Sequence, residues 1–490
     1  MGIEIDRTTF SDSDYADFRA ALERDLGFLA ALLDTPGFGS GPRSLGAELE
    51  MYIVDDNGRP LHANQEILEE SGDAQLQLEL NRYNLEYNLH PCAFSDNPFS
   101  ALEGELLDKL AYLRDVAARF GGRVVPIGIL PTLRQTDFGP HCITDRRRYH
   151  ALVRQLLLRR GGKFRIDIRG EDPLELEMTD ITLEGANTSF QVHYRVDPED
   201  YADTFNAIQL STPLAVAIGA NSPTLFGHNL WHETRVPLFK QSIDTRYVDR
   251  YSWNEPPRVS FGQGWVRRSA LELFAEVVCI YPPLLPICTE PGRGTGGDVP
   301  ALDELRLHQS TVWTWNRPIY DPAQGGHLRI EMRALPAGPT AVDMVANAAL
   351  LIGLAEGLRP RLRELLPAIP FGIAEYNFYR AAQHGLFARL VWPEKGQSGF
   401  REQPVGSLLG RLLPVAQDGL ESIGVDAAQA RRYLEVIERR LQQRRTGAIW
   451  QRSRLSALSR TMSREQALHA MLEEFIAYSN DNTPVSEWRP

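Results

Sequence analysis

Four short segments of this chain alternate apolar and polar residues, and their polar residues are of an unusual kind. The segments are residues 45–53, 84–90, 187–196 and 327–333. Alternation with a period of two predicts β-strands, in which successive side chains point to opposite faces. One face of each strand is apolar, and the other carries Glu, His, Gln, Asn or Arg. We therefore expect a sheet whose polar face is an active site that binds metal and phosphate.

The alternative is an antiparallel sheet with its polar face in water, because such a sheet alternates in the same way. A solvated face usually carries Lys, Thr and Ser. The four segments contain no lysine, and their charges come from Glu and Arg. This composition favours the active-site interpretation.

Segments with helical periodicity lie before, between and after these four segments. It predicts helices over residues 11–33, 99–120, 145–159 and 198–219, and after residue 333 over 340–358, 360–366, 373–386, 408–413, 427–444 and 464–478. Residues 123–129 are expected to form a buried strand. Residues 224–268, rich in Arg, Trp and His, are expected to form a long functional loop region. The glycine-rich residues 291–300 are expected to be a surface loop or lid.

The expected fold class is α+β, with a sheet in the first two-thirds of the chain and covering helices mostly from the last third. We expect a helical segment at residues 1–43, a catalytic sheet region at 44–340 and a helical region at 341–490. The three parts are expected to form one catalytic unit.

Composition narrows the class of protein. The 490 residues are 43% hydrophobic and 24% charged, which is typical of a globular protein with a substantial core. The net charge of −12 argues against nucleic acid or an anionic membrane as the main partner. The N-terminus is acidic and lacks signal-peptide features. The expected location is the cytoplasm.

Cysteine spacing and apolar runs exclude other classes. The four cysteines form no CxxC pair, so neither a zinc site nor a disulfide framework is indicated. No apolar run reaches the ~20 residues of a membrane helix. The best candidate, residues 271–288, contains two glutamates and three prolines.

The glutamates of the alternating segments are the candidate metal ligands. Glu48 and Glu50 are two residues apart, so both carboxylates lie on one face of a strand. Glu86 and Glu331, on two other strands, complete a carboxylate set. Carboxylate oxygens suit Mg²⁺ or Mn²⁺, and four like charges facing one another need cations. Any one of these glutamates alone would be read as a surface residue.

Histidine, glutamine and arginine share the same strand faces. His193 lies on a face with Gln191, and it is either structural or in contact with metal or phosphate. Arg329 and Arg333 flank Glu331, where they neutralise the glutamates, stabilise a transferring phosphoryl group, or do both. The candidate contacts to substrate or phosphate are Gln191, Arg235, Arg246 and Asn221.

The chain contains no Gly-x-Ser-x-Gly, Walker loop or His-Glu-x-x-His motif. This favours chemistry without a covalent enzyme intermediate.

Taken together, the segments resemble the carboxylate–amine ligase and glutamate–cysteine ligase type 2 family. The matching strings are Gly-Ala-Glu-Leu-Glu at 46–50, Leu-Glu-Tyr-Asn at 85–88, Thr-Ser-Phe-Gln-Val-His at 188–193, Ala-Asn-Ser-Pro at 220–223, Leu-Arg-Ile-Glu-Met-Arg at 328–333, Gly-Pro-Thr at 338–340, and residues 377–386 and 446–452. Each string is short, and their shared order over about residues 44–455 carries the resemblance.

The resemblance implies a glutamine-synthetase-like fold, with a curved, mostly antiparallel sheet forming an active-site funnel. It places Glu48, Glu50, Glu86 and Glu331 as metal ligands, and His193 and Arg333 near the phosphates of ATP. The implied reaction uses ATP and Mg²⁺ to phosphorylate a carboxylate, typically the γ-carboxylate of glutamate. An amine then displaces phosphate to give an amide. A small-molecule acid and amine are the expected partners, and a homo-oligomer is possible.

One departure concerns the strand of residues 190–193. Many family members carry a Thr-His-Val-His type strand where this chain has Phe-Gln-Val-His. The acceptor amine therefore stays open, cysteine included. Alternatives on the same fold are a phosphotransferase, an amide hydrolase, or a nucleotide- or metabolite-sensing protein without catalysis.

Overall fold

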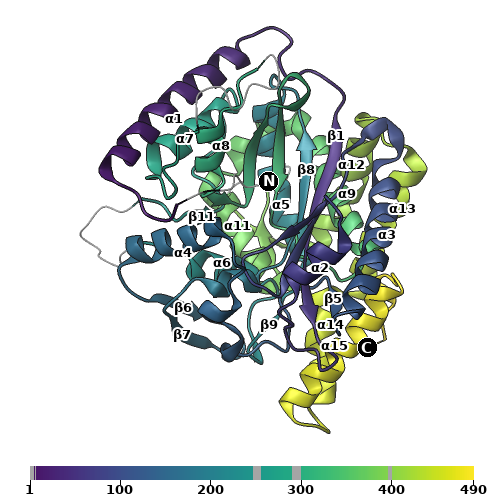
Figure 1. The fold of residues 1–490 in the computed structure, drawn as a ribbon. Helices are drawn as coiled ribbons and strands as arrows, with labels where there is room; N and C mark the ends of the chain where they lie inside the picture. Colours follow the sequence, from purple (N-terminus) through teal and green to yellow (C-terminus); the bar gives the residue numbers. More distant parts are fainter. Residues whose placement is uncertain (1–4, 6, 247–254, 290–298, 395–399, 490) are drawn as a thin grey trace.

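The computed structural model describes residues 5, 7–246, 255–289, 299–394 and 400–489 (Figure 1). Its centre is a curled antiparallel sheet in the order β13-β14-β8-β1-β3-β2. The strands are β13 (Asn316–Asp321), β14 (His327–Met332), β8 (Phe190–Arg195), β1 (Ser44–Val54), β3 (Asn84–Asn88) and β2 (Leu76–Leu78). Two short strands, β4 (Cys92–Ala93) and β5 (Arg123–Val125), pair with the two ends of β1. The four strands predicted from alternation are confirmed and are consecutive neighbours at the centre.

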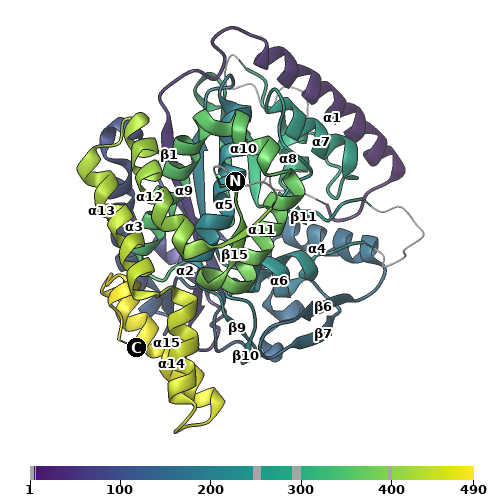
Figure 2. The same cartoon turned by 180° about the vertical axis from the view of Figure 1, so that it is seen from behind.

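Helices cover the apolar face of the sheet. Seen from behind, α5 (Tyr201–Gly219), α9 (Ala341–Leu358) and α12 (Val405–Ser422) cross the back of the molecule (Figure 2). The alternating apolar residues of the strands are buried in the same core as α5 and α9. α9 and α12 pack backbone to backbone: a Cβ on Gly357 would lie 2.1 Å from the Val415 carbonyl oxygen. Glycine is therefore required at this crossing.

The remaining elements surround this two-layer core. The helices are α1 (Asp12–Leu33), α2 (Asn64–Ser71), α3 (Pro98–Ala118), α4 (Arg147–Arg160), α6 (Arg235–Ser242), α7 (Leu271–Ile280), α8 (Asp303–Gln309), α10 (Leu362–Ala368), α11 (Phe371–His384), α13 (Ala427–Gln443), α14 (Gly447–Leu458) and α15 (Arg464–Asn480). The small strand pairs are β6 (Phe164–Ile168) with β7 (Leu174–Met178), β9 (Thr224–Leu225) with β10 (His228–Asn229), β11 (Val259–Ser260) with β12 (Trp313–Thr314), and β15 (Arg389–Val391) with β16 (Glu402–Pro404).

Most helices begin and end close to the predicted positions, and local chemistry explains where. α1 starts after Ser11, whose side chain accepts from the Asp14 N–H in a capping box. α4 ends at Gly161, which has a left-handed conformation. The predicted strand 123–129 ends early, at Val125, because Pro126 follows and proline cannot donate to a ladder.

Two expectations for loops and membrane segments need correction. Residues 224–268 are not a continuous loop, because α6 lies within them and buries Val236, Leu238 and Phe239. Most of the predicted loop 291–300 lies outside the described residues. Among the described residues, the helical stretch long and apolar enough to span a membrane is Ala341–Ala368 rather than residues 271–288, and 94% of its apolar window is buried inside the protein. Such burial is typical of a core helix.

Candidate active site

The register of the sheet brings the predicted polar residues onto one face. Directly opposed residues in antiparallel strands share a face. Glu50 pairs with Glu86, Glu48 with Gln191, and Glu331 with His193. Glu48 and Glu331, which are 283 positions apart in the sequence, therefore lie on the same face, and β8 between their strands adds Gln191 and His193. The face divides into two groups of potential metal ligands.

The first group, which we call the histidine cluster, consists of Glu48, His193 and Glu331. One ligand atom from each lies within 4.8 Å of the others. The Nε2 atom of His193 is 3.1 Å from a Glu48 carboxylate oxygen and 3.9 Å from a Glu331 oxygen. His193 is only 7% exposed, and its buried Nδ1 has no hydrogen-bond partner among the described residues.

Arginines neutralise the histidine cluster. Arg317 donates to both oxygens of Glu331, with Nε 2.6 Å and Nη2 2.9 Å away, and Arg333 Nη1 lies 3.2 Å from the same carboxylate. Burial opposes ionisation, but these two guanidinium groups hold the pKa of Glu331 well below its usual range. The pKa of Glu48 is also lowered, because the effect of His193 outweighs burial.

The second group, which we call the carboxylate cluster, consists of Glu50, Glu79 and Glu86, again with ligand atoms within 4.8 Å of one another. Burial and the charges of Glu48 and Glu50 raise the pKa of Glu86 to about 8. Burial and the charges of Glu86, Glu50 and Glu184 raise the pKa of Glu79 well above its ordinary value. Glu184, close to this cluster, has a pKa raised to about 7 by burial and by Glu50. These carboxylates repel one another and favour a bound cation.

Gln191 links the two clusters. Its Nε2 donates to Glu50 Oε1 at 2.8 Å, and its Oε1 accepts a hydrogen bond from Arg333. Arg333 in turn contacts Glu331 of the histidine cluster. The second oxygen of Glu50 accepts from the backbone N–H of Ser189 at 2.7 Å. The predicted residues Gln191 and Arg333 therefore lie at the centre of the candidate site.

Two predicted binding residues are buried beside this face. Arg235 is 3% exposed, forms an ion pair with Glu233 at 3.2 Å and donates to the carbonyls of Ala334 and Arg333. Burial raises the pKa of Glu50, and the charge of Arg235 acts against that rise. Asn221 is fully buried, where its side chain donates to one carbonyl and accepts from Gln451. Both hold the segments that surround the clusters, and their contact with substrate stays a prediction.

The remaining two predicted arginines have other partners. Arg329 shares the polar face but pairs with Asp321 at 3.3 Å and lies opposite Arg195. Arg246 is paired with Asp244 at 2.7 Å. Neither has an ion pair with the clusters within the described part of the chain, and their roles also stay predictions.

Three residues of the site are additional to the sequence prediction. Arg317 could have been found, because residues 316–321 form a strand directly before β14. Glu79 follows a strand of only three residues, and Glu184 lies in a 3-10 turn, Thr182–Ala186. Neither position has an alternating pattern of its own.

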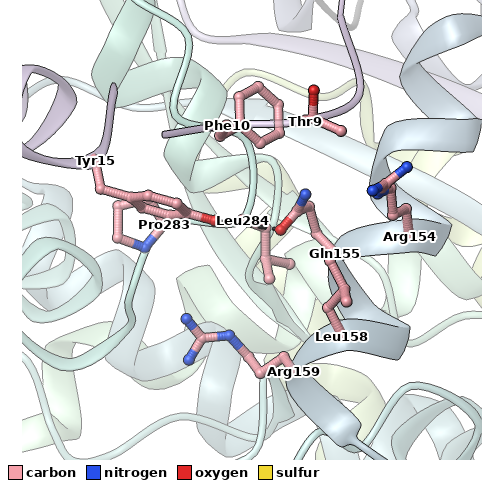
Figure 3. Close-up of a pocket in the computed structure, with 9 residues that line it drawn as sticks. All are labelled: Thr9, Phe10, Tyr15, Arg154, Gln155, Leu158, Arg159, Pro283 and Leu284. Atoms are coloured by element: carbon pink, nitrogen blue, oxygen red, sulfur yellow. Dashed lines mark hydrogen bonds between the residues drawn. The ribbon is translucent and has the colours of Figure 1, made fainter. Parts of the chain in front are cut away.

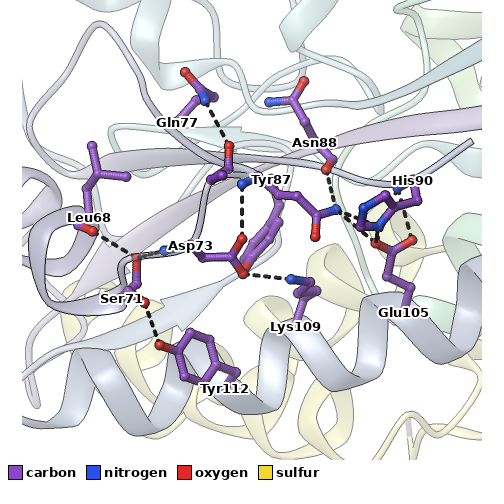
Figure 4. A network of polar contacts seen from close by, with 12 residues as sticks. Leu68, Ser71, Asp73, Gln77, Tyr87, Asn88, His90, Glu105, Lys109 and Tyr112 are labelled. Carbon is purple, nitrogen blue, oxygen red and sulfur yellow. Dashed lines mark hydrogen bonds and ion pairs between the residues drawn. The ribbon is translucent and has the colours of Figure 1, made fainter.

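A polar network behind the site anchors β2, which Glu79 directly follows, and β3, which carries Glu86 (Figure 4). Tyr87, on the opposite face of β3, hydrogen-bonds through its hydroxyl to Asp73. Lys109 of α3 lies 2.6 Å from the same carboxylate and 5.1 Å from the centre of the Tyr87 ring. This network fixes the β2–β3 edge against α3.

The ligand chemistry fits a hard divalent cation. The carboxylate cluster offers only oxygen atoms, which Mg²⁺ prefers, and the histidine cluster adds an imidazole that Mn²⁺ also accepts. The Nε2 atom of His193, which faces Glu48 and Glu331 and makes no hydrogen bond among the described residues, and the raised pKa of Glu86 are both features that a bound cation would relieve.

Comparisons with known proteins show which family this chain resembles. The model of glutamate–cysteine ligase family 2 matches residues 44–259. A putative glutamate–cysteine ligase 2-1 of Frankia alni is 24% identical over 92% of this chain and 99% of its own length. A putative glutamate–cysteine ligase 2 of Sorangium cellulosum is also 24% identical, with the same coverage. The resemblance predicted from the sequence is thereby confirmed.

The fold comparison extends over most of the chain. The crystal structure of glutamate–cysteine ligase from Francisella tularensis in complex with AMP has a TM-score of 0.51 at 11% identity, covering 92% of this chain and 96% of that one. The glutamate–cysteine ligase-like fold is therefore established. The family match and the two relatives support an enzyme of the amide-forming carbon–nitrogen ligase class.

Proposed function

We propose that this chain is an ATP- and Mg²⁺-dependent ligase that joins a glutamate-like carboxylate to an amine through an acyl phosphate. The observation that carries the proposal is the pair of clusters on one sheet face, linked by Gln191 and Arg333. A site that binds only a single metal ion would need one such cluster. Two adjoining clusters with arginines fit the transfer of a highly charged phosphoryl group.

The proposed nucleotide rests on the same geometry and on a structural relative. The Francisella ligase, which shares the fold, was solved with AMP. Arg317 and Arg333 supply positive charge beside the carboxylates that would hold metal. We propose Glu48, Glu331 and His193 as one ligand set and Glu50, Glu79 and Glu86 as the other. Bound Mg²⁺ would offset the charge on the phosphates.

The reaction needs two displacements. An oxygen of the substrate carboxylate attacks the γ-phosphorus of ATP, and the bond to ADP breaks. The amine nitrogen then attacks the acyl carbon, phosphate leaves with that carboxylate oxygen, and the amine loses a proton. In this scheme Arg333 lies where charge develops on the phosphoryl group, and Gln191 fixes its guanidinium. Arg329, Arg235, Arg246 and Asn221 are proposed to bind or orient the substrates.

The test is product analysis with purified protein, Mg-ATP, L-glutamate and a panel of amines and amino acids. We expect ADP release that needs one acid and one amine, together with a new amide mass. Glutamate labelled with ¹⁸O in its carboxylates should transfer one label to inorganic phosphate, because the carboxylate oxygen leaves with phosphorus.

Other outcomes would support the alternatives. A stable phosphorylated acid without an amine requirement would indicate a phosphotransferase. Amide cleavage without nucleotide would indicate a hydrolase. Tight binding of Mg-ATP without ADP release from any pair would favour the sensing protein.

A further inference from the structure

A cavity lies outside the two clusters, between α4, the start of α1 and residues 283–284 (Figure 3). Its volume is about 360 Å³, within the range of small-molecule sites. Its lining includes Phe10, Tyr15, Arg154, Gln155, Leu158 and Arg159. None of these residues belongs to the candidate active site.

One part of the cavity wall is apolar. Phe10 and Tyr15 meet edge to face with ring centres 6.5 Å apart. Leu158 projects from α4 with 65% of its surface exposed, although it is a large aliphatic residue. Pro283 and Leu284 are buried and also line the cavity. These side chains form an apolar surface, and its burial against an apolar group of a ligand is favourable.

The other part of the wall carries arginine and amide groups from a single helix. Arg154 and Arg159 stand on either side of Gln155 (Figure 3). Arg154 has no ion pair or hydrogen bond within the described part of the chain. Arg159 donates to Glu255 at 3.4 Å. Gln155 is already occupied, since it accepts from the Tyr15 hydroxyl at 3.2 Å.

We propose that this cavity binds a small organic carboxylate that carries an aliphatic or aromatic group. The two arginines supply donors for the carboxylate, and the aromatic and aliphatic wall accommodates its apolar part. An inorganic anion would leave the apolar wall uncovered, and a neutral hydrocarbon would leave Arg154 without an anion. The proposal concerns binding alone, so it does not depend on the ligase assignment.

The experiment is a titration of the full chain with 3-phenylpropionate, followed by calorimetry or ligand-observed NMR. We expect saturable binding that L-glutamate and Mg-ATP do not displace. The alcohol 3-phenylpropan-1-ol and inorganic phosphate, each tested as the probe, should bind at least about tenfold more weakly, because each lacks one half of the recognised chemistry.

Two variants locate the binding. Arg154→Gln should weaken binding about tenfold, since it removes one charge-assisted contact, and Leu158→Gln should weaken it by removing apolar surface. Both side chains are exposed, so neither change threatens the fold. Arg363→Gln, an exposed arginine on α10, is the matched control and should bind as the unchanged protein does.

Several results would overturn the proposal. They are no saturable binding at millimolar concentration, equal binding in Arg154→Gln and Leu158→Gln, displacement by L-glutamate or Mg-ATP, or phosphate binding as tight as that of the probe.

Discussion

The two clusters of the sheet contain similar ligands but differ in their electrostatics. In the histidine cluster, Arg317 and Arg333 hold the pKa of Glu331 well below its usual range. In the carboxylate cluster, burial and neighbouring carboxylates raise the pKa of Glu86 to about 8. The negative charge of the histidine cluster is balanced by Arg317 and Arg333. In the carboxylate cluster, the carboxylates repel one another.

This difference suggests that the two clusters have different roles. A compensated cluster keeps its geometry without metal and is suited to position phosphate-binding arginines. A repulsive cluster gains most from a cation, so its folding free energy and its metal affinity are coupled. The predictions below separate these two behaviours.

The largest expected effect is from Glu331→Gln. It removes a proposed metal ligand and leaves Arg317 and Arg333 without their shared carboxylate. We expect kcat/KM in the ligase assay to fall at least about 100-fold. Because a buried ion pair is also broken, the variant should unfold at a lower temperature in EDTA.

Two further variants test whether misfolding explains the loss of activity in Glu331→Gln. Glu48→Gln leaves the arginine pairs of Glu331 intact and should lose comparable activity with the fold preserved. Glu177→Gln, on an exposed carboxylate paired with Lys163, should keep full activity. Full activity of Glu48→Gln and Glu331→Gln would contradict the assignment of the site.

An intermediate effect is expected from Gln191→Leu, which removes the hydrogen-bonded link between the two clusters without changing the net charge. The change removes the hydrogen bonds to Glu50 and Arg333. Each bond involves a charged group, so kcat/KM should fall about tenfold. Unchanged kinetics would show that the link between the clusters has no part in turnover.

A smaller effect concerns thermal stability and metal. Millimolar Mg²⁺ should raise the Tm of the unchanged protein by roughly 2–4 °C by mass action. Glu86→Gln removes one repelling carboxylate, so it should raise the Tm in EDTA and shrink the Mg²⁺ increment. A full Mg²⁺ increment in this variant would exclude Glu86 as a ligand.

The smallest effect is a change in the slope of stability against pH. The folded pKa of Glu86 is about 8, above the unfolded value of about 4.3. Its stabilising contribution is therefore complete below pH ~4 and is lost as the pH rises through 8. In EDTA, the Tm of Glu86→Gln should fall less between pH 5 and pH 8 than that of the unchanged protein.

The histidine cluster has the opposite sign. The lowered pKa of Glu331 gives stability that is present above the unfolded value and is lost in acid. Glu331→Gln should therefore lessen the loss of stability below pH ~4. Parallel pH profiles for the two variants would contradict the electrostatic difference between the clusters.

The strands could be predicted from sequence because alternation is a local property. Residues 45–53 and 327–333 each show their polar face without reference to a partner strand. The pairing of Glu50 with Glu86, by contrast, depends on strand order and register, which alternation alone does not specify. The family resemblance, rather than periodicity, implied that the four strands form one funnel.

There are physical reasons why Glu79 and α6 were not predicted from the sequence. Glu79 is brought to its cluster by the end of β2, a strand too short to show a period. α6 was missed because it is short, contains Pro237 and is buried on several sides, so it has no amphipathic stripe. Homo-oligomerisation stays a prediction, as does the division of the chain at residues 43 and 340.

The most direct test of the central claim is anomalous diffraction from crystals grown with Mn²⁺ and ADP. The account predicts peaks at both clusters, one among Glu48, His193 and Glu331 and one among Glu50, Glu79 and Glu86. Peaks elsewhere, or neither cluster occupied in an enzyme whose turnover requires the metal, would contradict it.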